Sequence, residues 1–313
     1  MKRKPYRYLL YVGLRVMEGI VSWLPRETAL SLANLIGKTA FLVARRERKK
    51  TIQHLTLAYG EEKSEKEIRD LAERVFIHFA EVAVDVLRLR KLTRQELEEL
   101  IDPGEGLSIF KEVLAQGRGA ILLTAHFGNW ELMGAFVMFS GYPGAVVARK
   151  IYYEKFNEVL LDLRERATLR TIYQDAPPKE FLNVLRQNQI LGILADQDVE
   201  RLDGIFVPFF GRPAYTLTAP VKMALATGAP LVPAFLVKNG NRYRFLVEKP
   251  IYVEMKGSRE ETIRDYTVRW SRIVEEKIKM YPDQWAWMHP RWKTAPDEKD
   301  RIPKPVTVGE VQS

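Results

Sequence analysis

Between residues 120 and 237 the sequence alternates short apolar runs with longer amphipathic segments. The runs predict buried strands at 120–124, 145–148, 190–195 and 231–237, and the segments predict helices at 130–139, 153–167, 178–188 and 216–227. Such alternation is typical of folds in which helices join parallel strands and cover both faces of the sheet. We therefore expect an α/β core with a largely parallel central sheet flanked by helices.

Further elements are predicted on both sides of this core. Ser64 with Glu67 and Thr93 with Glu96 have the spacing of capping boxes, which predicts a helix after each. A strand at 243–247 and a helix at 262–280 complete the expected elements. We predict three parts: a helical membrane-associated anchor at 1–50, an α/β domain at 51–295, and a disordered tail at 296–313, which is rich in Asp, Lys and Pro.

The N-terminal segment from Arg7 to Leu24 is mostly apolar, but its polar residues recur every three or four positions and so share one stripe of a helix. An unbroken apolar length below roughly 20 residues is too short to span a bilayer. Arg15 and Glu18 are also costly within hydrocarbon. The segment therefore predicts a helix that lies in or dips into a membrane, with a buried core helix as the alternative.

A basic cluster follows the second apolar segment, 29–44. It consists of Arg45, Arg46, Arg48, Lys49 and Lys50. The chain carries a formal net charge of +9, which favours anionic partners of any kind, nucleic acid included. Next to an apolar anchor, such a cluster favours an anionic membrane surface, with about 1 kcal/mol per cation. We expect membrane rather than nucleic acid, with a solvated helix end as the other interpretation.

Three places in the sequence follow predicted strands and carry polar side chains. They are residues 125–131, Arg149 with Lys150, and residues 196–198. In open α/β sheets, chemistry gathers at the carboxyl ends of the strands. We therefore expect the functional site to be built from these three loops.

His126 lies in the first of these loops, between a predicted strand and a predicted helix. If Asn129 caps that helix, Glu131 falls in its first turn and can fold back toward the imidazole. A carboxylate on one ring nitrogen fixes the tautomer and raises the basicity of the other, as a general base requires. A histidine with a purely structural role remains the alternative.

Other chemistries fit this sequence less well. The chain has no Cys, and it contains neither a His-Glu-x-x-His helix, nor a phosphate-binding loop, nor a Gly-x-Ser-x-Gly nucleophile elbow. We expect no metal and no cofactor. Without a placed nucleophile, direct attack by an acceptor on an activated donor is the simpler expectation.

The string from His126 to Glu131 resembles the signature of glycerolipid and lysophospholipid acyltransferases. A longer set of motifs resembles the late acyltransferases of lipid A biosynthesis: Asn129-Trp-Glu131, Arg149, Leu194-Ala-Asp-Gln-Asp198, Gly204-Ile-Phe-Val-Pro-Phe-Phe-Gly-Arg-Pro213 and Trp287-Met-His-Pro-Arg-Trp-Lys293. The resemblance implies an O-acyltransferase that uses an acyl-carrier-protein thioester as donor. It also implies a phosphorylated, Kdo-bearing lipid A precursor as acceptor, at the cytoplasmic face of an inner membrane.

The resemblance also implies roles for single residues. His126 is expected to act as the base with Glu131 as its partner, and Arg149 is expected to bind phosphate or steady an oxyanion. Further substrate-binding residues are expected among Asn129, Asp196, Asp198, Phe209 and Arg212. Loop capping is the alternative for Asp196 and Asp198, and a core position is the alternative for Phe209. Arg164 and Arg166 are expected on a solvated helix face, and His289 is expected to be structural.

One departure from the family pattern concerns the acceptor. The family often has an Asn-Pro pair after the second-motif arginine, and the sequence after Arg149 lacks it. Another glycolipid or a lysophospholipid is therefore the alternative acceptor. A non-catalytic membrane scaffold and a nucleic-acid-binding protein are the alternatives of another class.

Overall fold

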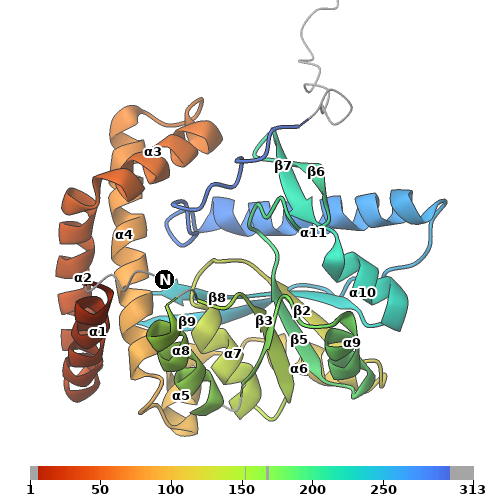
Figure 1. Ribbon diagram of the computed structural model, residues 1–313, viewed down its shortest axis with the longest axis horizontal. Coiled ribbons are helices and arrows are strands. Elements are labelled where there is room, and N and C mark those ends of the chain that lie inside the picture. Colours follow the sequence, from red (N-terminus) through yellow and green to blue (C-terminus); the bar gives the residue numbers. More distant parts are fainter. Residues whose placement is uncertain (1–5, 152, 167–168, 297–313) are drawn as a thin grey trace, which may run out of the picture.

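A seven-stranded sheet with the order β1-β9-β8-β2-β5-β3-β4 lies at the centre of the molecule (Figure 1). All neighbouring strands pair in parallel except β8 and β9, which form an antiparallel pair. Every residue of the central strand β2 is buried, as expected of a parallel strand covered on both faces. The expectation of an α/β fold with a largely parallel sheet is thereby confirmed.

The computed structural model describes residues 6–151, 153–166 and 169–296. The strands are β1 Ile101–Asp102, β2 Ala120–Thr124, β3 Gly144–Ala148, β4 Arg170–Tyr173, β5 Ile190–Leu194, β6 Gly204–Phe209, β7 Arg212–Leu217, β8 Leu231–Asn239 and β9 Arg242–Val247. The helices are α1 Tyr6–Trp23, α2 Arg26–Val43, α3 Arg45–Tyr59, α4 Glu65–Arg88, α5 Arg94–Leu100, α6 Gly106–Leu114, α7 Trp130–Phe139, α8 Glu154–Arg166, α9 Pro178–Arg186, α10 Ala219–Thr227 and α11 Arg259–Met280.

The strands predicted from apolar runs are all present, but the sequence did not reveal β1, β4 or the β6–β7 hairpin. β4 forms one edge of the sheet and is only partly buried, so it has no continuous apolar run. The hairpin pairs antiparallel outside the main sheet, and β7 takes up residues 216 and 217, which the sequence assigned to a helix. The helix there begins at Ala219.

Helices α1, α2 and α4 lie side by side against one end of the sheet (Figure 1). The predicted capping boxes at Ser64 and Thr93 are both formed, and a third one opens α11 at Ser258. α2 packs closely on α4, because a Cβ added to Gly37 would lie 2.5 Å from the Cα of Ile77. At the carboxyl end of β8, Lys238 forms an ion pair with Glu81 of α4, so α4 lies beside this end of the sheet.

The polar stripe of α1 faces the protein and the apolar faces point outward. Glu18 is only 5% exposed and forms ion pairs with Arg15 at 2.6 Å and with Arg90 at 3.2 Å. In contrast, Leu9 is 70% exposed and Trp23 is 80% exposed. A helix on a water-facing surface has the opposite orientation.

Among the described residues, no helix has both the length and the apolar character needed to cross a bilayer. The anchoring role of residues 1–50 stays a prediction. Apart from Pro296, the predicted disordered tail lies outside the described residues.

Candidate active site

The loop from Ala125 to Asn129 joins β2 to α7 and is held by backbone hydrogen bonds to distant segments. Gly128 N–H donates to the carbonyl of Gln284, and Asn129 N–H donates to that of Leu236, each at 2.9 Å. Gly128 has a φ of +60°, and a Cβ there would lie 2.0 Å from the carbonyl oxygen of Leu236. Only glycine fits this position, so the loop has a defined path that presents His126 at the edge of the sheet.

The imidazole of His126 pairs with the carboxylate of Asp196. Nδ1 lies 2.8 Å from Asp196 Oδ1, and the backbone N–H of His126 donates to Oδ2 at 3.0 Å. The side chain of His126 is 23% exposed, whereas Asp196 is 4% exposed. With Nδ1–H directed at the carboxylate, Nε2 is left as the nitrogen that can accept a proton.

The pairing follows from the register of two parallel strands. Thr124 of β2 lies opposite Leu194 of β5, and His126 and Asp196 each come two residues later. Both side chains therefore leave the same edge of the sheet on adjacent strands. The sequence located both loops, but only the strand order shows that they are neighbours.

Asp196 stays ionised in this site. Burial alone raises the pKa of its carboxyl group, but the charge of His126 and the hydrogen bonds from His126 and Trp285 outweigh burial and lower it to about 2. The indole N–H of Trp285 donates to Oδ2 at 2.8 Å. A carboxylate held in this way orients the imidazole and stabilises its protonated form.

Glu131 does not take the position that the sequence analysis expected. It lies in the first turn of α7, as predicted, but its carboxylate forms a two-point ion pair with Arg164 of α8. Arg164 Nε donates to Oε2 at 2.9 Å and Nη2 to Oε1 at 2.5 Å. The expected pairing of Glu131 with His126 is wrong, as is the expected solvated position of Arg164, because each has a closer partner of opposite charge.

Asn129 is fully buried and serves the helix rather than a substrate. Its Oδ1 accepts the N–H of Leu132 at 3.0 Å, which caps α7, and its Nδ2 donates to the hydroxyl of Tyr243 at 3.3 Å. The capping role predicted from sequence is confirmed. The expected contact with substrate is corrected, because no part of the side chain is accessible.

Asp198 and Phe209 also lie in structural positions. The carboxylate of Asp198 accepts the N–H and the hydroxyl of Thr294, at 2.7 and 2.6 Å, and so fastens the C-terminal segment. Phe209 is 1% exposed and packs against Trp285 and Trp292. Phe209 is thus a core residue and not a substrate-binding one, and Asp198 holds a loop, as the structural alternative for each predicted. Asp196 is the member of the acidic motif that contacts His126.

The two predicted arginines have different surroundings. Arg212 begins β7, and its Nε donates to the carbonyl of Leu57 at 3.0 Å, which ties the hairpin to α3. Arg149 is exposed directly after β3, two strands from β2 in the same sheet. Strand spacing puts it roughly 10 Å from the His126 loop. Arg149 is thus exposed at this edge of the sheet, whereas Arg212 holds the hairpin to α3. Substrate binding by either arginine stays a prediction.

Three further residues lie near His126, and the sequence analysis gave none of them a catalytic or substrate-binding role. The ring of His289 lies 5.4 Å from that of His126, and the ring of Trp130 lies 5.2 Å away. The amide Nε2 of Gln197 lies 3.2 Å from both ring nitrogens of His126. Burial, and next the charge of His126, lower the pKa of His289, so this ring is neutral near pH 7. The expected structural role of His289 did not anticipate its position beside the imidazole.

The arrangement can remove a proton from a hydroxyl group. It has one oriented and partly exposed imidazole, and a buried anion to stabilise the imidazolium that forms. Within the described parts of the chain, no three or more His, Asp or Glu side chains are grouped so as to hold a metal ion.

Fold and site together define an α/β protein with an imidazole–carboxylate pair at the carboxyl edge of its sheet. Comparison with known protein families identifies the family. A model of the bacterial lipid A biosynthesis acyltransferase family matches residues 2–294. The chain belongs to that family.

Several known proteins are similar to this chain. The chain is 29% identical over 207 residues to a phosphatidylinositol mannoside acyltransferase of Mycobacterium tuberculosis, a match that covers 65% of this chain and 62% of the relative. It is 27% identical over 310 residues to the lipid A biosynthesis lauroyltransferase of Escherichia coli K12, covering 94% of each. Among solved structures, a 1-acyl-sn-glycerophosphate acyltransferase of Thermotoga maritima matches with a TM-score of 0.35 and 15% identity, covering 83% of this chain and 99% of that chain.

Proposed function

We propose that this protein transfers a fatty acyl group from an acyl-carrier-protein thioester to a hydroxyl group of a phosphorylated glycolipid of the lipid A precursor type. The observation that carries the proposal is the His126–Asp196 pair, in which Nδ1 is bound to a buried carboxylate and the partly exposed ring keeps Nε2 as its proton acceptor. The family membership supplies the class of reaction.

The proposed reaction is direct acyl transfer. Nε2 of His126 takes the proton of the acceptor hydroxyl while its oxygen attacks the thioester carbonyl carbon. The tetrahedral intermediate then expels the thiolate as the C–S bond breaks, and the imidazolium returns the proton to the sulfur. Asp196 stabilises the imidazolium throughout, and no covalent enzyme intermediate is required.

Arg149 is proposed to bind an anionic group of the substrate. It is exposed at the same sheet edge as His126, and a guanidinium can hold a phosphate through two parallel hydrogen bonds. The acceptor that we favour carries such phosphates. A mannosylated phosphoinositide is a second candidate, favoured by the similarity to the mycobacterial acyltransferase.

We further propose that the protein works on a membrane surface, at the cytoplasmic face of the inner membrane. Exposed apolar side chains are found on α2 as well as on α1; those on α2 are Leu35, Leu42 and Val43. The exposed cations at the start of α3 follow directly in the chain. An apolar face bordered by cations suits the boundary between acyl chains and anionic headgroups.

The decisive experiment is an assay with purified protein, an acyl-carrier-protein thioester and a lipid A precursor. We expect His126→Ala and Asp196→Asn each to lower turnover by about 10²-fold or more, because the base is lost or loses its orientation. Asp70→Asn, at an exposed position of α4, serves as the matched control. Normal turnover by a folded His126→Ala variant would contradict the proposed role of His126 as the general base. Transfer only to a mannosylated phosphoinositide would replace the acceptor.

A further inference from the structure

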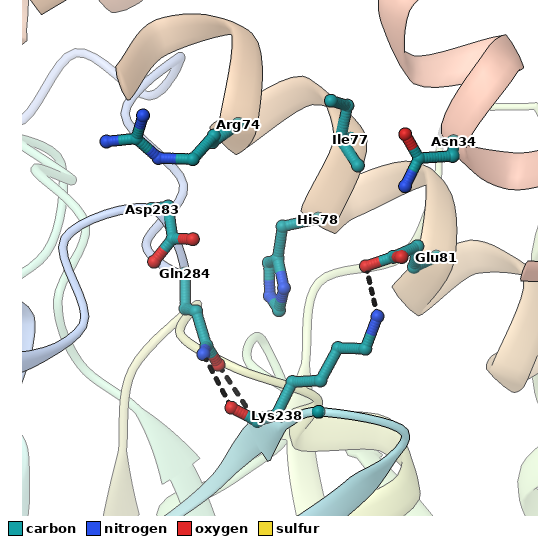
Figure 2. Close-up of a pocket in the computed structure, with 9 residues that line it drawn as sticks. Asn34, Arg74, Ile77, His78, Glu81, Lys238, Asp283 and Gln284 are labelled. Carbon is teal, nitrogen blue, oxygen red and sulfur yellow. Dashed lines mark hydrogen bonds and ion pairs between the residues drawn. The ribbon is translucent and has the colours of Figure 1, made fainter. Parts of the chain in front are cut away.

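A polar cavity of about 380 Å³ lies between α2, α4 and the end of β8, apart from the side chains that surround His126. Figure 2 shows His78, Arg74 and Glu81 reaching into it from α4, with Lys238 below. Its size falls within the roughly 300–1,000 Å³ of small-molecule sites. Nothing in the proposed transfer chemistry uses these residues.

The wall of the cavity contains an unsatisfied buried histidine. His78 is only 4% exposed, and its Nε2 has no hydrogen-bond partner among the residues that the structure describes. The ring points from α4 into the space between Gln284 and Lys238 (Figure 2). A buried polar atom without a partner is costly, so a bound group that forms a hydrogen bond with Nε2 would stabilise this position.

The protonation state of His78 determines which kind of hydrogen-bond partner its Nε2 lacks. Burial lowers the pKa of the ring to about 3, although its hydrogen bond to the backbone of Gly128 acts in the opposite direction. The ring is therefore neutral and donates to Gly128, which leaves Nε2 as an acceptor. The missing partner is a hydrogen-bond donor such as a hydroxyl group.

The remaining lining is polar and balanced in charge. Lys238 forms an ion pair with Glu81, while Arg74 and Asp283 have no ion pair or hydrogen bond within the described part of the chain. Two cations and two carboxylates therefore face the cavity, together with the amide of Asn34. This mixture of donors and acceptors suits an uncharged group that both donates and accepts hydrogen bonds.

Other classes of ligand fit the lining less well. Ile77 is its one large aliphatic side chain, so a fatty acyl chain would face mainly polar groups. An isolated phosphate would meet Glu81 and Asp283 as well as Arg74, and carboxylates repel anions. Hydroxyl groups can pair with carboxylates, guanidinium, amide and imidazole alike.

We propose that this cavity binds a sugar ring, as an uncharged, hydroxyl-rich group that donates a hydrogen bond to His78. The ring comes either from the glycolipid acceptor or from a free sugar in solution. The first source rests on the proposed function, because only a glycolipid acceptor brings a sugar to the protein during transfer.

The cavity is joined to the catalytic loop through the backbone. Gly128, two residues from His126, donates its N–H to the Gln284 carbonyl and binds the ring of His78. The Gln284 amide in turn exchanges two hydrogen bonds with the backbone of Lys238, at 2.8 and 2.9 Å (Figure 2). A sugar seated against His78 therefore contacts a residue that holds the loop in place.

Binding is tested with a soluble probe, methyl glucopyranoside, observed by saturation-transfer NMR on the full chain. We expect a signal with the wild type and its loss in the double variant Arg74→Ala/Asp283→Ala, whose side chains have no other partner within the described ranges. Arg264→Ala/Asp265→Ala, at exposed positions of α11, is the matched control and should keep the signal. An equal signal from all three proteins, or none from the wild type, would overturn a free-sugar source.

The second arm measures acyl transfer to the glycolipid. If the acceptor supplies the sugar, the Arg74→Ala/Asp283→Ala variant should raise the acceptor KM about tenfold, as expected for losing one hydrogen bond to a charged group. KM should stay unchanged in the α11 control. An unchanged KM with lost probe binding assigns the site to a free sugar, and an unchanged KM with unchanged probe binding refutes the proposal. Should the wild type transfer no acyl group to any glycolipid, the proposed function fails, while the NMR result still decides the cavity.

Discussion

The carboxylate that serves His126 is Asp196, seventy residues away in the chain, rather than Glu131, five residues away. Glu131 is paired with Arg164, and both side chains are largely buried. Removing one member of a buried ion pair leaves the other charge uncompensated, which costs about 3–5 kcal/mol. The pair therefore contributes first to the packing of α7 against α8, close to the catalytic loop.

We expect Glu131→Leu alone and Arg164→Met alone to lower the free energy of unfolding by about 3 kcal/mol each, and the double variant to recover most of that loss. Urea unfolding of the four proteins measures this coupling. If the single losses simply add in the double variant, the ion pair is not what stabilises the region. Turnover of a stable double variant distinguishes a structural role of Glu131 from a catalytic one. A folded but inactive protein would indicate that Glu131 takes part in catalysis.

At the scale of elements, α1 has the reverse of a soluble helix's orientation. Its polar stripe faces the protein, where Glu18 forms an ion pair with Arg90. Its apolar faces are exposed. The neighbouring α2 adds exposed apolar side chains to the same layer. Such a surface is costly in water and is stabilised by contact with lipid.

Vesicle binding tests the orientation of α1 directly. We expect Leu9→Gln/Val16→Gln/Trp23→Gln to weaken binding to vesicles that contain phosphatidylglycerol on the order of a hundredfold, since each side chain loses about 1 kcal/mol of apolar burial. Met255→Gln/Met280→Gln, which changes exposed apolar side chains outside α1 and α2, is the control. Equal co-sedimentation of both variants with vesicles would contradict a membrane-facing α1.

At the scale of the whole molecule, buried histidines make the fold sensitive to acid. Burial lowers the pKa of His54, His78 and His289 below 6.5 in the folded protein. Below pH 6.5 the unfolded chain gains protons that the folded chain does not. The free energy of unfolding therefore decreases as the pH is lowered. Asp196 acts in a lower window, because its carboxyl pKa of about 2 lies below the ordinary 3.8. Its contribution is present above pH 3.8 and is lost as the pH falls toward 2.

Replacing His78 should flatten part of this dependence. We expect His78→Gln to reduce the loss of stability between pH 6.5 and 4 by up to about 1.4 kcal/mol per pH unit, the contribution of one proton. Chemical denaturation at several pH values measures the slope of the unfolding free energy against pH. Because His54 and His289 remain, this slope should stay positive in the variant. An unchanged slope would show that His78 is not held neutral in the folded state.

Local patterns in the sequence determined most of the elements and the position of the candidate base. Apolar runs located β2, β3, β5 and β8, capping boxes located the starts of α4 and α5, and His126 was expected in the loop before α7. These features depend on residues close together in the chain, where side-chain periodicity and capping act.

Only the tertiary structure decided the partners. The order of the strands brought Asp196 to His126, the fold of the C-terminal segment brought His289 beside it, and packing against α4 turned the apolar faces of α1 outward. Each of these results depends on contacts between segments distant in the sequence. A local pattern does not encode which surface a strand or helix meets, because that choice is made by the burial and pairing of the whole chain.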